Sequence, residues 1–339
     1  MKKRKICVYL ACNKFMIIYL EVIIITNCNS QPVTALITGA SGFIGSRLTQ
    51  RLVRNGWNVH TIVRLTSNLN LLDSVIDKIK IHYYTNSFTS LSQIVEKVSP
   101  DITFHLASVA TIHYTPENIR NMLDCNVTFG TELVEAISSS GTSHFINTGT
   151  FSQHFDQQDY NPNSLYAATK QAFEDILCYY SETNRLKVLT LTLFDNYGPF
   201  DPRPKIMNLL YSSYVDNKPL VMTPGEQYLD LVFIDDVIDA YIVAANRLLY
   251  GNSKTQEKFV VSSGELIQLK QLVTEFESII GKELPITWGG IDYRPREIMI
   301  PWRRGTPLPH WYPRVSLKEG IKSFLKNNQR EEKQEDEQS

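Results

Sequence analysis

Short apolar runs alternate along the chain with longer segments whose apolar residues recur at helical spacing. Runs rich in β-branched and aromatic residues predict strands at residues 33–38, 59–63, 81–84, 101–106, 144–147 and 187–194. The segments between them predict helices around Leu48 and Leu52, over residues 91–98 and 118–138, and around residues 166–180. Because strand and helix alternate, we expect an α/β fold with a doubly wound parallel sheet covered by helices on both faces.

The alternation weakens after residue 198, where prolines become frequent. We interpret this part as a smaller, loop-rich C-terminal lobe. The apolar run at 231–234, a helix from residue 236 and the run at 258–261 are expected to return to the main sheet. The predicted division is a leader over 1–31, a first domain over 32–197 with 227–262 returning to it, a second lobe over 198–226 and 263–325, and a disordered tail over 326–339.

The first residues resemble the start of a signal peptide, because four basic residues precede a loosely apolar stretch. Asn13, Lys14 and Glu21 interrupt that stretch, whereas a membrane span needs about 20 mostly apolar residues. We therefore interpret residues 1–31 as an extension or a disordered leader and expect a cytoplasmic protein. The five cysteines are odd in number and widely spaced, which favours free thiols over a disulfide or metal site. The net charge of −1 argues against nucleic-acid binding.

A glycine-rich loop lies between the first predicted strand and the first predicted helix. Glycine there permits the turn, lets the backbone approach a pyrophosphate and allows the helix to pack on the strand. The helix N-terminus offers unpaired N–H groups to the phosphates. The loop therefore predicts a Rossmann-type dinucleotide site. The residues expected to hold the cofactor here are Gly39, Ser41, Gly42, Phe43, Ile44 and Gly45.

The GxxGxxG spacing resembles that of the extended short-chain dehydrogenases, also called the NAD-dependent epimerase/dehydratase family. Four further segments resemble family motifs, and together they extend the resemblance over roughly residues 33–324. These are the run from His105 to Ser108, in which Leu106 and Ala107 would contact the cofactor, then Asn126, the run from Phe194 to Pro199 and the run from Val232 to Val237. The resemblance also implies a homodimer.

The end of the second predicted strand indicates which dinucleotide is bound. An acidic residue there would bind the ribose hydroxyl of NAD, whereas an arginine can pair with the 2′-phosphate of NADP. The chain has Arg64 at this position and no acid before Asp73. We therefore expect a preference for NADP(H), with NAD(H) as the alternative.

Tyr166 and Lys170 are four residues apart on a predicted helix and so share one face. A phenol, with a pKa near ~10, exchanges protons poorly at neutral pH until a nearby ammonium stabilises its anion. We predict that this pair is catalytic, and that both residues also contact the cofactor. Alignment with the family implies that Thr150 is the hydroxyl partner that binds the substrate oxygen, with Thr148 as the alternative.

The residues after Thr150 exclude one reaction. Dehydratases of the family carry an acidic pair there, whereas this chain has Phe151 and Ser152. The run from Asn147 to His154 resembles the CDP-abequose and CDP-paratose synthases, which reduce the 4-keto group of a CDP-linked dideoxyhexose with NADPH. In that resemblance Gln153 and His154 flank the sugar.

A nucleotide diphosphate calls for arginine, whose planar fork matches phosphate oxygens. Arg294 matches the family's late arginine, and Asp195 and Asn196 occupy the positions of its phosphate-contacting segment. Two departures are present, because Leu229 replaces a second family arginine and Asp195 replaces an asparagine. Other cations that would compensate are Arg203, Lys205 and Arg296.

The leading hypothesis is an NADPH-dependent reductase of the 4-keto group of a nucleotide-linked 6-deoxy or 3,6-dideoxyhexose, serving surface polysaccharide (O-antigen) synthesis. An alternative is a nucleotide-sugar 4-epimerase with tightly held NAD. A third is a catalytically silent NAD(P)-binding protein, against which the intact Thr150, Tyr166 and Lys170 argue. No metal is expected.

Overall fold

The computed structural model describes residues 31–111, 114–183 and 186–336, and the predicted leader falls almost entirely outside them. Residues from Val33 onward form one compact unit. Its centre is a seven-stranded sheet of order β11-β6-β5-β4-β1-β2-β3, in which every neighbouring pair is parallel. The strands are β1 (Thr34–Thr38), β2 (Asn58–Arg64), β3 (Lys80–Tyr84), β4 (Ile102–His105), β5 (His144–Thr150), β6 (Lys187–Leu193) and β11 (Gln256–Val261).

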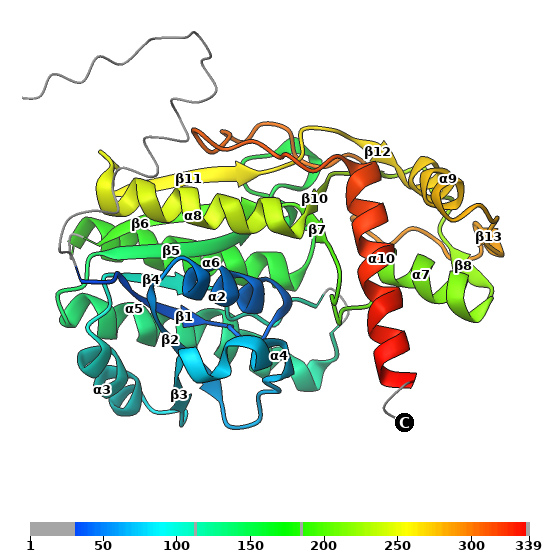
Figure 1. The fold of residues 1–339 in the computed structure, drawn as a ribbon. Coiled ribbons are helices and arrows are strands. Elements are labelled where there is room, and N and C mark those ends of the chain that lie inside the picture. Colours follow the sequence, from blue (N-terminus) through cyan, green and yellow to red (C-terminus); the bar gives the residue numbers. More distant parts are fainter. Residues whose placement is uncertain (1–30, 112–113, 184–185, 337–339) are drawn as a thin grey trace, which may run out of the picture. The chain divides into compact units, whose positions relative to one another are not determined.

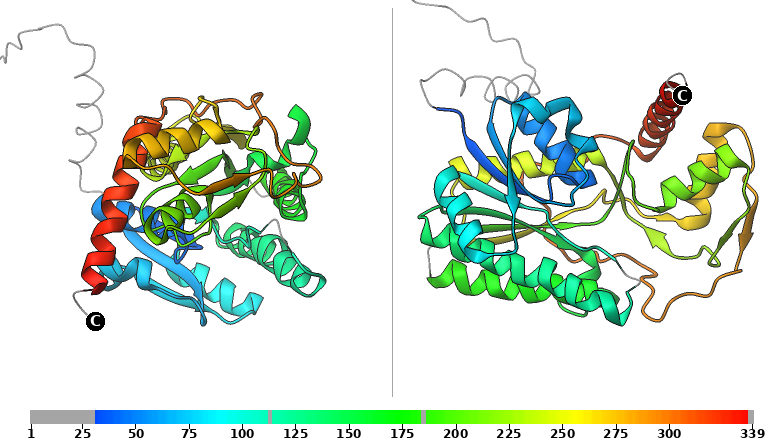
Figure 2. Two further views of the ribbon diagram at one scale, coloured as in Figure 1. Left: turned by 90° about the vertical axis from the view of Figure 1, so that its right-hand side faces the viewer. Right: turned by 90° about the horizontal axis from the view of Figure 1, so that it is seen from below.

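Helices cover both faces of this sheet, which confirms the predicted doubly wound fold (Figures 1 and 2). Residues from α2 (Phe43–Arg54) and α8 (Ile234–Tyr250) share a hydrophobic core with one face. Residues from α3 (Phe88–Val98), α5 (Phe129–Ser139) and α6 (Leu165–Thr183) pack on the other. Successive side chains of a strand point to opposite faces, so Phe145 and Ile146 of β5 belong to different cores.

The predicted helix over residues 118–138 is helical but not uniform. It consists of α4 (Ile119–Leu123), a π-helical turn at Asp124–Thr128 and then α5. A short 3₁₀ turn, Pro116–Asn118, precedes it, and another 3₁₀ segment, Asn70–Lys78, lies between β2 and β3. The π turn widens the helix at Asn126, next to the carboxyl end of β4, and π turns of this kind are frequent at functional sites.

The predicted return of residues 231–234 to the main sheet is wrong. β10 (Leu231–Phe233) pairs with β7 (Asp195–Tyr197) in a separate two-stranded parallel sheet. β7 begins two residues after β6 ends, so the chain continues beyond the carboxyl end of β6. β10 pairs with this continuation and not with a strand of the main sheet. Of the segment 227–262, β11 alone among its strands joins the seven-stranded sheet.

The remaining elements gather beyond the carboxyl ends of the strands (Figure 1). They are α7 (Ile206–Asp216), β8 (Leu220–Met222), β9 (Tyr228–Leu229), β12 (Ile267–Gln268), α9 (Leu269–Ile280), β13 (Ile286–Trp288) and α10 (Leu317–Asp336). β8 pairs with β13 and β9 with β12. Most of these elements lie in the stretches predicted as a second lobe.

The prediction that a disordered tail begins at residue 326 is wrong, because α10 continues through Asp336. Ile321 and Phe324 are fully buried and anchor the helix, and the residues that follow are mostly good helix formers. Asn328 extends this anchoring, since its side-chain oxygen accepts a hydrogen bond from the Phe200 amide at 3.2 Å. Within the described part of the chain, no helix is long and apolar enough to cross a membrane.

Candidate active site

The glycine loop connects β1 to α2 at the carboxyl end of the sheet. Gly39 has a φ of +73°, and a Cβ there would lie 2.6 Å from the Ala107 amide nitrogen. A Cβ at Gly45 would collide with the carbonyl of Gly39. At Gly42, by contrast, a Cβ would meet the Gly39 oxygen at 3.4 Å and nothing nearer, since this glycine faces a cavity. Gly39 thus permits the turn, Gly42 leaves the cavity wall open, and Gly45 lets α2 pack closely on the loop. This arrangement fits a dinucleotide pyrophosphate.

Two cavities meet at this loop. The larger, of about 690 Å³, runs from the loop toward the ends of β2 and β3. The smaller, of about 400 Å³, runs toward the end of β5. Both are lined by Gly39, Gly42, Leu106 and Ser108. Ser41 and Ala107 line the larger cavity, and Phe43, Ile44 and Gly45 line the smaller one, so all the predicted cofactor residues of the two loops lie here.

Arg64 ends β2 and lines the larger cavity together with Ser67. The Ser67 hydroxyl accepts a hydrogen bond from the Arg64 amide at 3.1 Å, which closes the turn after the strand. The carboxylates of Asp124 and Glu132 belong to the helical segment that forms another part of the wall. Glu132 accepts a hydrogen bond from the Tyr84 hydroxyl at 2.8 Å. The strand end itself therefore presents a guanidinium and a hydroxyl, which suit an anionic group better than a neutral ribose.

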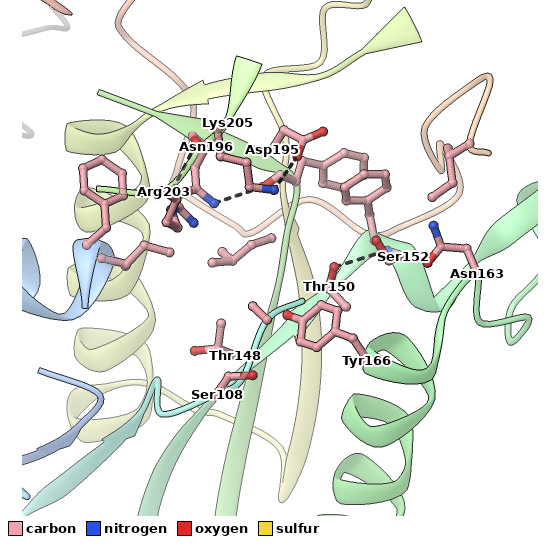
Figure 3. A pocket seen from close by; sticks show the side chains of 18 of the residues that line it. Ser108, Thr148, Thr150, Ser152, Asn163, Tyr166, Asp195, Asn196, Arg203 and Lys205 are labelled. Atoms are coloured by element: carbon pink, nitrogen blue, oxygen red, sulfur yellow. Dashed lines mark hydrogen bonds and ion pairs between the residues drawn. The ribbon is translucent and has the colours of Figure 1, made fainter. Parts of the chain in front are cut away.

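Thr150 and Tyr166 lie beside each other at the wall of the smaller cavity (Figure 3). Thr150 ends β5, and Tyr166 lies in the first turn of α6. Burial raises the pKa of Tyr166 to about 12, while hydrogen bonds to Ser108 and Thr150 and the positive charge of Arg203 act in the opposite direction. The phenol is therefore protonated at neutral pH and can donate its proton within the cavity.

Lys170 lies one helical turn beyond Tyr166 and is almost completely buried. Burial lowers the pKa of its ammonium to about 8, and the carboxylate of Glu174 opposes that effect. An ammonium with such a pKa is largely charged at neutral pH and loses its charge at moderately alkaline pH. The predicted Tyr166–Lys170 arrangement on one helix face is present.

The two candidate threonines differ in how their hydroxyl groups are used. The Thr148 hydroxyl donates to the His105 carbonyl at 2.9 Å and lies 2.7 Å from the Tyr241 hydroxyl. The Thr150 hydroxyl instead accepts from the Ser152 amide at 3.3 Å and is hydrogen-bonded to Tyr166, so it lies at the cavity wall beside the phenol. This geometry favours Thr150 as the group that contacts a substrate oxygen.

Ser108 was not among the predicted site residues, although it directly follows the run at 105–107 that resembles a family motif. Its hydroxyl donates to Asn126 at 3.1 Å, and the same Asn126 oxygen accepts from the Val109 amide at 2.7 Å. Asn126 also donates to Thr169, the residue that precedes Lys170, at 2.9 Å. The π-turn asparagine thus ties the loop after β4 to α6.

Gln153 and His154 do not line the cavity. The Gln153 side chain is completely buried beneath Thr150, and its amide bonds to Thr150, Gln171 and Glu174. His154 is also buried, and its ring stacks on Trp302 with centroids 3.6 Å apart. Ser152 and Asn163 instead line the wall beside Thr150 (Figure 3). Sequence spacing placed the right segment at the cavity but could not say which way each side chain of the 3₁₀ turn Phe151–Gln153 points.

The far wall of the smaller cavity carries three cations, Arg203, Lys205 and Arg294. Asn196 accepts a hydrogen bond from Arg203 at 2.8 Å, and Asp195 lies 3.9 Å from the Lys205 ammonium (Figure 3). Glu297 holds Arg294 through two hydrogen bonds of 2.7 Å each. Of the three compensating cations named from the sequence, Arg203 and Lys205 lie at this wall. Arg296 is not in the lining and bonds to Asn161 and Pro162.

Residues 35–261 match the model of the NAD dependent epimerase/dehydratase family. The CDP-abequose synthase of Yersinia pseudotuberculosis is 29% identical over 299 residues, which cover 86% of this chain and 99% of that protein. The CDP-abequose synthase of Salmonella typhimurium is 28% identical, with 86% and 97% covered. The UDP-glucuronate 4-epimerase of Thermodesulfobacterium geofontis is 25% identical, with 85% and 93% covered.

Solved structures share the fold. The UDP-glucose 4-epimerase of Thermotoga maritima with UDP-glucose superposes with a TM-score of 0.78 at 20% identity, covering 88% of this chain and 99% of that one. The UDP-glucose 4-epimerase of Thermus thermophilus in complex with NAD gives a TM-score of 0.76 at 20% identity, with the same coverage.

Proposed function

The chain belongs to the NAD dependent epimerase/dehydratase family, and on that premise we propose that it reduces the 4-keto group of a nucleotide-linked 6-deoxy or 3,6-dideoxyhexose with NADPH. The observation that carries the proposal is the wall beside Thr150. Phe151 stacks on Phe194 there, with ring centroids 4.9 Å apart and planes 11° from parallel. Elimination of water from a sugar requires an acid and a base at this wall, whereas reduction of a ketone requires neither beyond Tyr166.

The chain's own residues supply the proton and orient the ketone. The Thr150 hydroxyl would hydrogen-bond the carbonyl oxygen, and Tyr166 Oη would donate its proton to that oxygen as it gains charge. The Lys170 ammonium stabilises the resulting phenolate until a solvent proton replaces the one transferred. The glycine loop and Arg64 would hold NADPH, which would supply the hydride for the carbonyl carbon.

The cationic wall supports a diphosphate-linked substrate. Arg203, Lys205 and Arg294 offer forked and point-charge donors at this wall of the cavity. Asn196 and Glu297 fix two of these cations in place, which reduces the side-chain entropy lost when a ligand binds. The stacked phenylalanines between this wall and Thr150 suit the deoxygenated edge of a hexose better than a fully hydroxylated one, because a buried hydroxyl there would lack a partner.

The similarity to CDP-abequose synthases supports the 4-keto-dideoxyhexose and a role in making sugars of a surface polysaccharide. The similarity to 4-epimerases supports a second candidate, an epimerase that retains NAD. Arg64 at the end of β2 favours the reductase, because a reductase exchanges NADPH at every turnover while an epimerase keeps its NAD.

An isotope experiment separates the two functions. The enzyme is incubated with a CDP-linked 4-keto-3,6-dideoxyhexose and NADPH deuterated at the transferable position, and the product is examined by mass spectrometry and NMR. The proposal predicts one deuterium at C4 of each product molecule. Turnover of a UDP-hexose to its 4-epimer without deuterium incorporation would favour the epimerase instead.

A further inference from the structure

A buried amide directly supports the Thr150 backbone. The Gln153 side chain is completely buried, and its Oε1 accepts a hydrogen bond from the Thr150 amide at 2.9 Å. Its Nε2 donates to Gln171 Oε1 at 2.9 Å and to Glu174 Oε1 at 3.0 Å. All three bonds join the turn after β5 to itself and to α6. Since both N–H groups of the amide are used, the side chain is held at both ends.

Glu174 determines which way this amide faces. An ionised carboxylate accepts hydrogen bonds and donates none, so Nε2 of Gln153 must face Glu174 and Oε1 must face Thr150. The carboxylate is held in turn by the Lys258 ammonium of β11, 2.8 Å from its second oxygen. Gly149 leaves the necessary room, because a Cβ there would lie 2.7 Å from Glu174 Oε1.

We propose that Gln153 and Glu174 are positioning residues for the reaction: the carboxylate orients the buried amide, and the amide holds the backbone of Thr150 so that its hydroxyl stays at the cavity wall. Neither side chain lines the cavity, so they act through Thr150 rather than on the substrate. The inference rests on the role of Thr150 in the proposed function, and it applies to reduction and to epimerisation alike, because Thr150 contacts the substrate oxygen in both.

The variant Gln153→Glu tests whether residue 153 must donate a hydrogen bond to Glu174, and the readout is turnover as a function of pH. Two facing carboxylates cannot satisfy each other. One proton shared between them restores the contact between residues 153 and 174, and the carboxyl introduced at position 153 still accepts from the Thr150 amide, so of the three original bonds the one to Gln171 alone is lost. Turnover of Gln153→Glu is therefore expected to approach wild type at low pH and to fall about tenfold or more as the shared proton is lost with rising pH. The NADPH dissociation constant is expected to remain at the wild-type value.

Other charged groups face this pair and must be held constant. Lys258 comes from β11, Lys170 from the preceding turn of α6, and His154 from the turn after β5. Wild type and variant share all three groups. A fall in turnover with rising pH that occurs in Gln153→Glu and not in wild type is therefore due to the carboxyl group at position 153. Gln93→Glu is the matched control. It makes the same chemical change at an exposed position of α3 outside the lining of both cavities, and so the wild-type profile is expected.

The double variant Gln153→Glu with Glu174→Gln exchanges donor and acceptor. The amide introduced at position 174 can donate to the carboxylate introduced at position 153 and accept from Lys258. Turnover at pH 8 is therefore expected to recover to within about threefold of wild type, and the additional fall in turnover with rising pH is expected to disappear. A wild-type profile in Gln153→Glu would overturn the proposal. A folded double variant as impaired at pH 8 as Gln153→Glu, or without turnover, would overturn it as well. Absence of reduction by the wild type would contradict the proposed function alone, since the profiles are measured on whichever turnover the wild type shows.

Discussion

The guanidinium of Arg203 lies over the ring of Phe43, with its Cζ 4.9 Å from the ring centroid. Phe43 is the first residue of α2, directly after the glycine loop, and Arg203 lies in the segment between β7 and α7. Asp201 fixes the plane of the guanidinium by accepting hydrogen bonds of 2.7 and 2.6 Å. One contact therefore joins the cofactor loop to the cationic wall of the cavity.

Arg203→Ala is expected to raise the KM for the nucleotide sugar about tenfold or more, because a hydrogen bond to a charged group contributes about 1.5–3 kcal/mol. Arg203→Lys keeps the charge but loses the planar fork and is expected to recover only part of the loss. Steady-state kinetics check both variants. Arg314→Ala is the control, since this exposed arginine lies over Tyr312, outside the cavity lining. An unchanged KM in Arg203→Ala would contradict the assignment of this wall to the diphosphate.

Tyr166→Phe is expected to lower kcat by roughly 10²–10⁴-fold while leaving NADPH binding nearly intact, because the ring keeps its packing and the proton donor is lost. Turnover and the NADPH dissociation constant are measured on the same preparation. The control is Tyr250→Phe, which removes an exposed hydroxyl at the end of α8. More than half of the wild-type rate in Tyr166→Phe would exclude this phenol as the proton donor.

Arg64→Ala is expected to remove a preference for NADPH over NADH. One charged partner of the 2′-phosphate contributes about 1.5–3 kcal/mol, so NADPH affinity should fall about 10- to 150-fold while NADH affinity changes little. Fluorescence titration gives the four dissociation constants. Arg54→Ala, at the exposed end of α2, controls for loss of positive charge near the domain. Equal affinities of the wild type for the two cofactors would refute the NADPH preference.

Acidification is expected to destabilise the fold through the His60–His82 pair, whose rings stack with nitrogens 2.9 Å apart. Burial, followed by the charge of His82, lowers the pKa of His60 to about 4, against about 6.5 in the unfolded chain. The unfolded state then binds more protons between these values, so stability is complete above pH 6.5 and is lost as the pH falls toward 4. His105, whose pKa burial lowers to about 3, adds to the trend.

The measurement is the thermal unfolding midpoint between pH 7 and pH 4.5. The double variant His60→Gln with His82→Gln should show a shallower fall than the wild type, because the buried His105 and His154, whose pKa values burial also lowers, still contribute. Identical slopes in the two proteins would show that the pair does not contribute.

Local patterns predicted the main sheet because its strands are buried on both faces and bounded by turn residues. They failed at residues 231–234, because an apolar run gives its burial but not its pairing partner, and β10 pairs with β7 outside the main sheet. They also failed at residue 326, where helix-forming residues continue α10 beyond its buried part.

Motif spacing placed the glycine loop, Thr150 and Tyr166 at the cavity walls, because each lies at a fixed interval from a strand end. Lys170 shares the helix face of Tyr166 but lines neither cavity, so its contact with the cofactor stays a prediction. Motif spacing could not assign Gln153, since successive side chains of a 3₁₀ turn point about 120° apart and the turn's orientation is set by the folded chain. Arg203 likewise depends on Asp201 and Phe43 for its orientation, and contacts of that kind arise only in the folded chain.

The central claim is that the enzyme consumes external NADPH instead of recycling a bound cofactor. The decisive measurement follows NADPH absorbance with dialysed enzyme and a CDP-linked 4-keto-3,6-dideoxyhexose, and assays the dialysed protein for retained cofactor. We expect one equivalent of NADPH oxidised per sugar reduced, and little cofactor on the protein. Stoichiometric NAD retained after dialysis, together with interconversion of a UDP-hexose and its 4-epimer without added reductant, would contradict the claim and establish the epimerase.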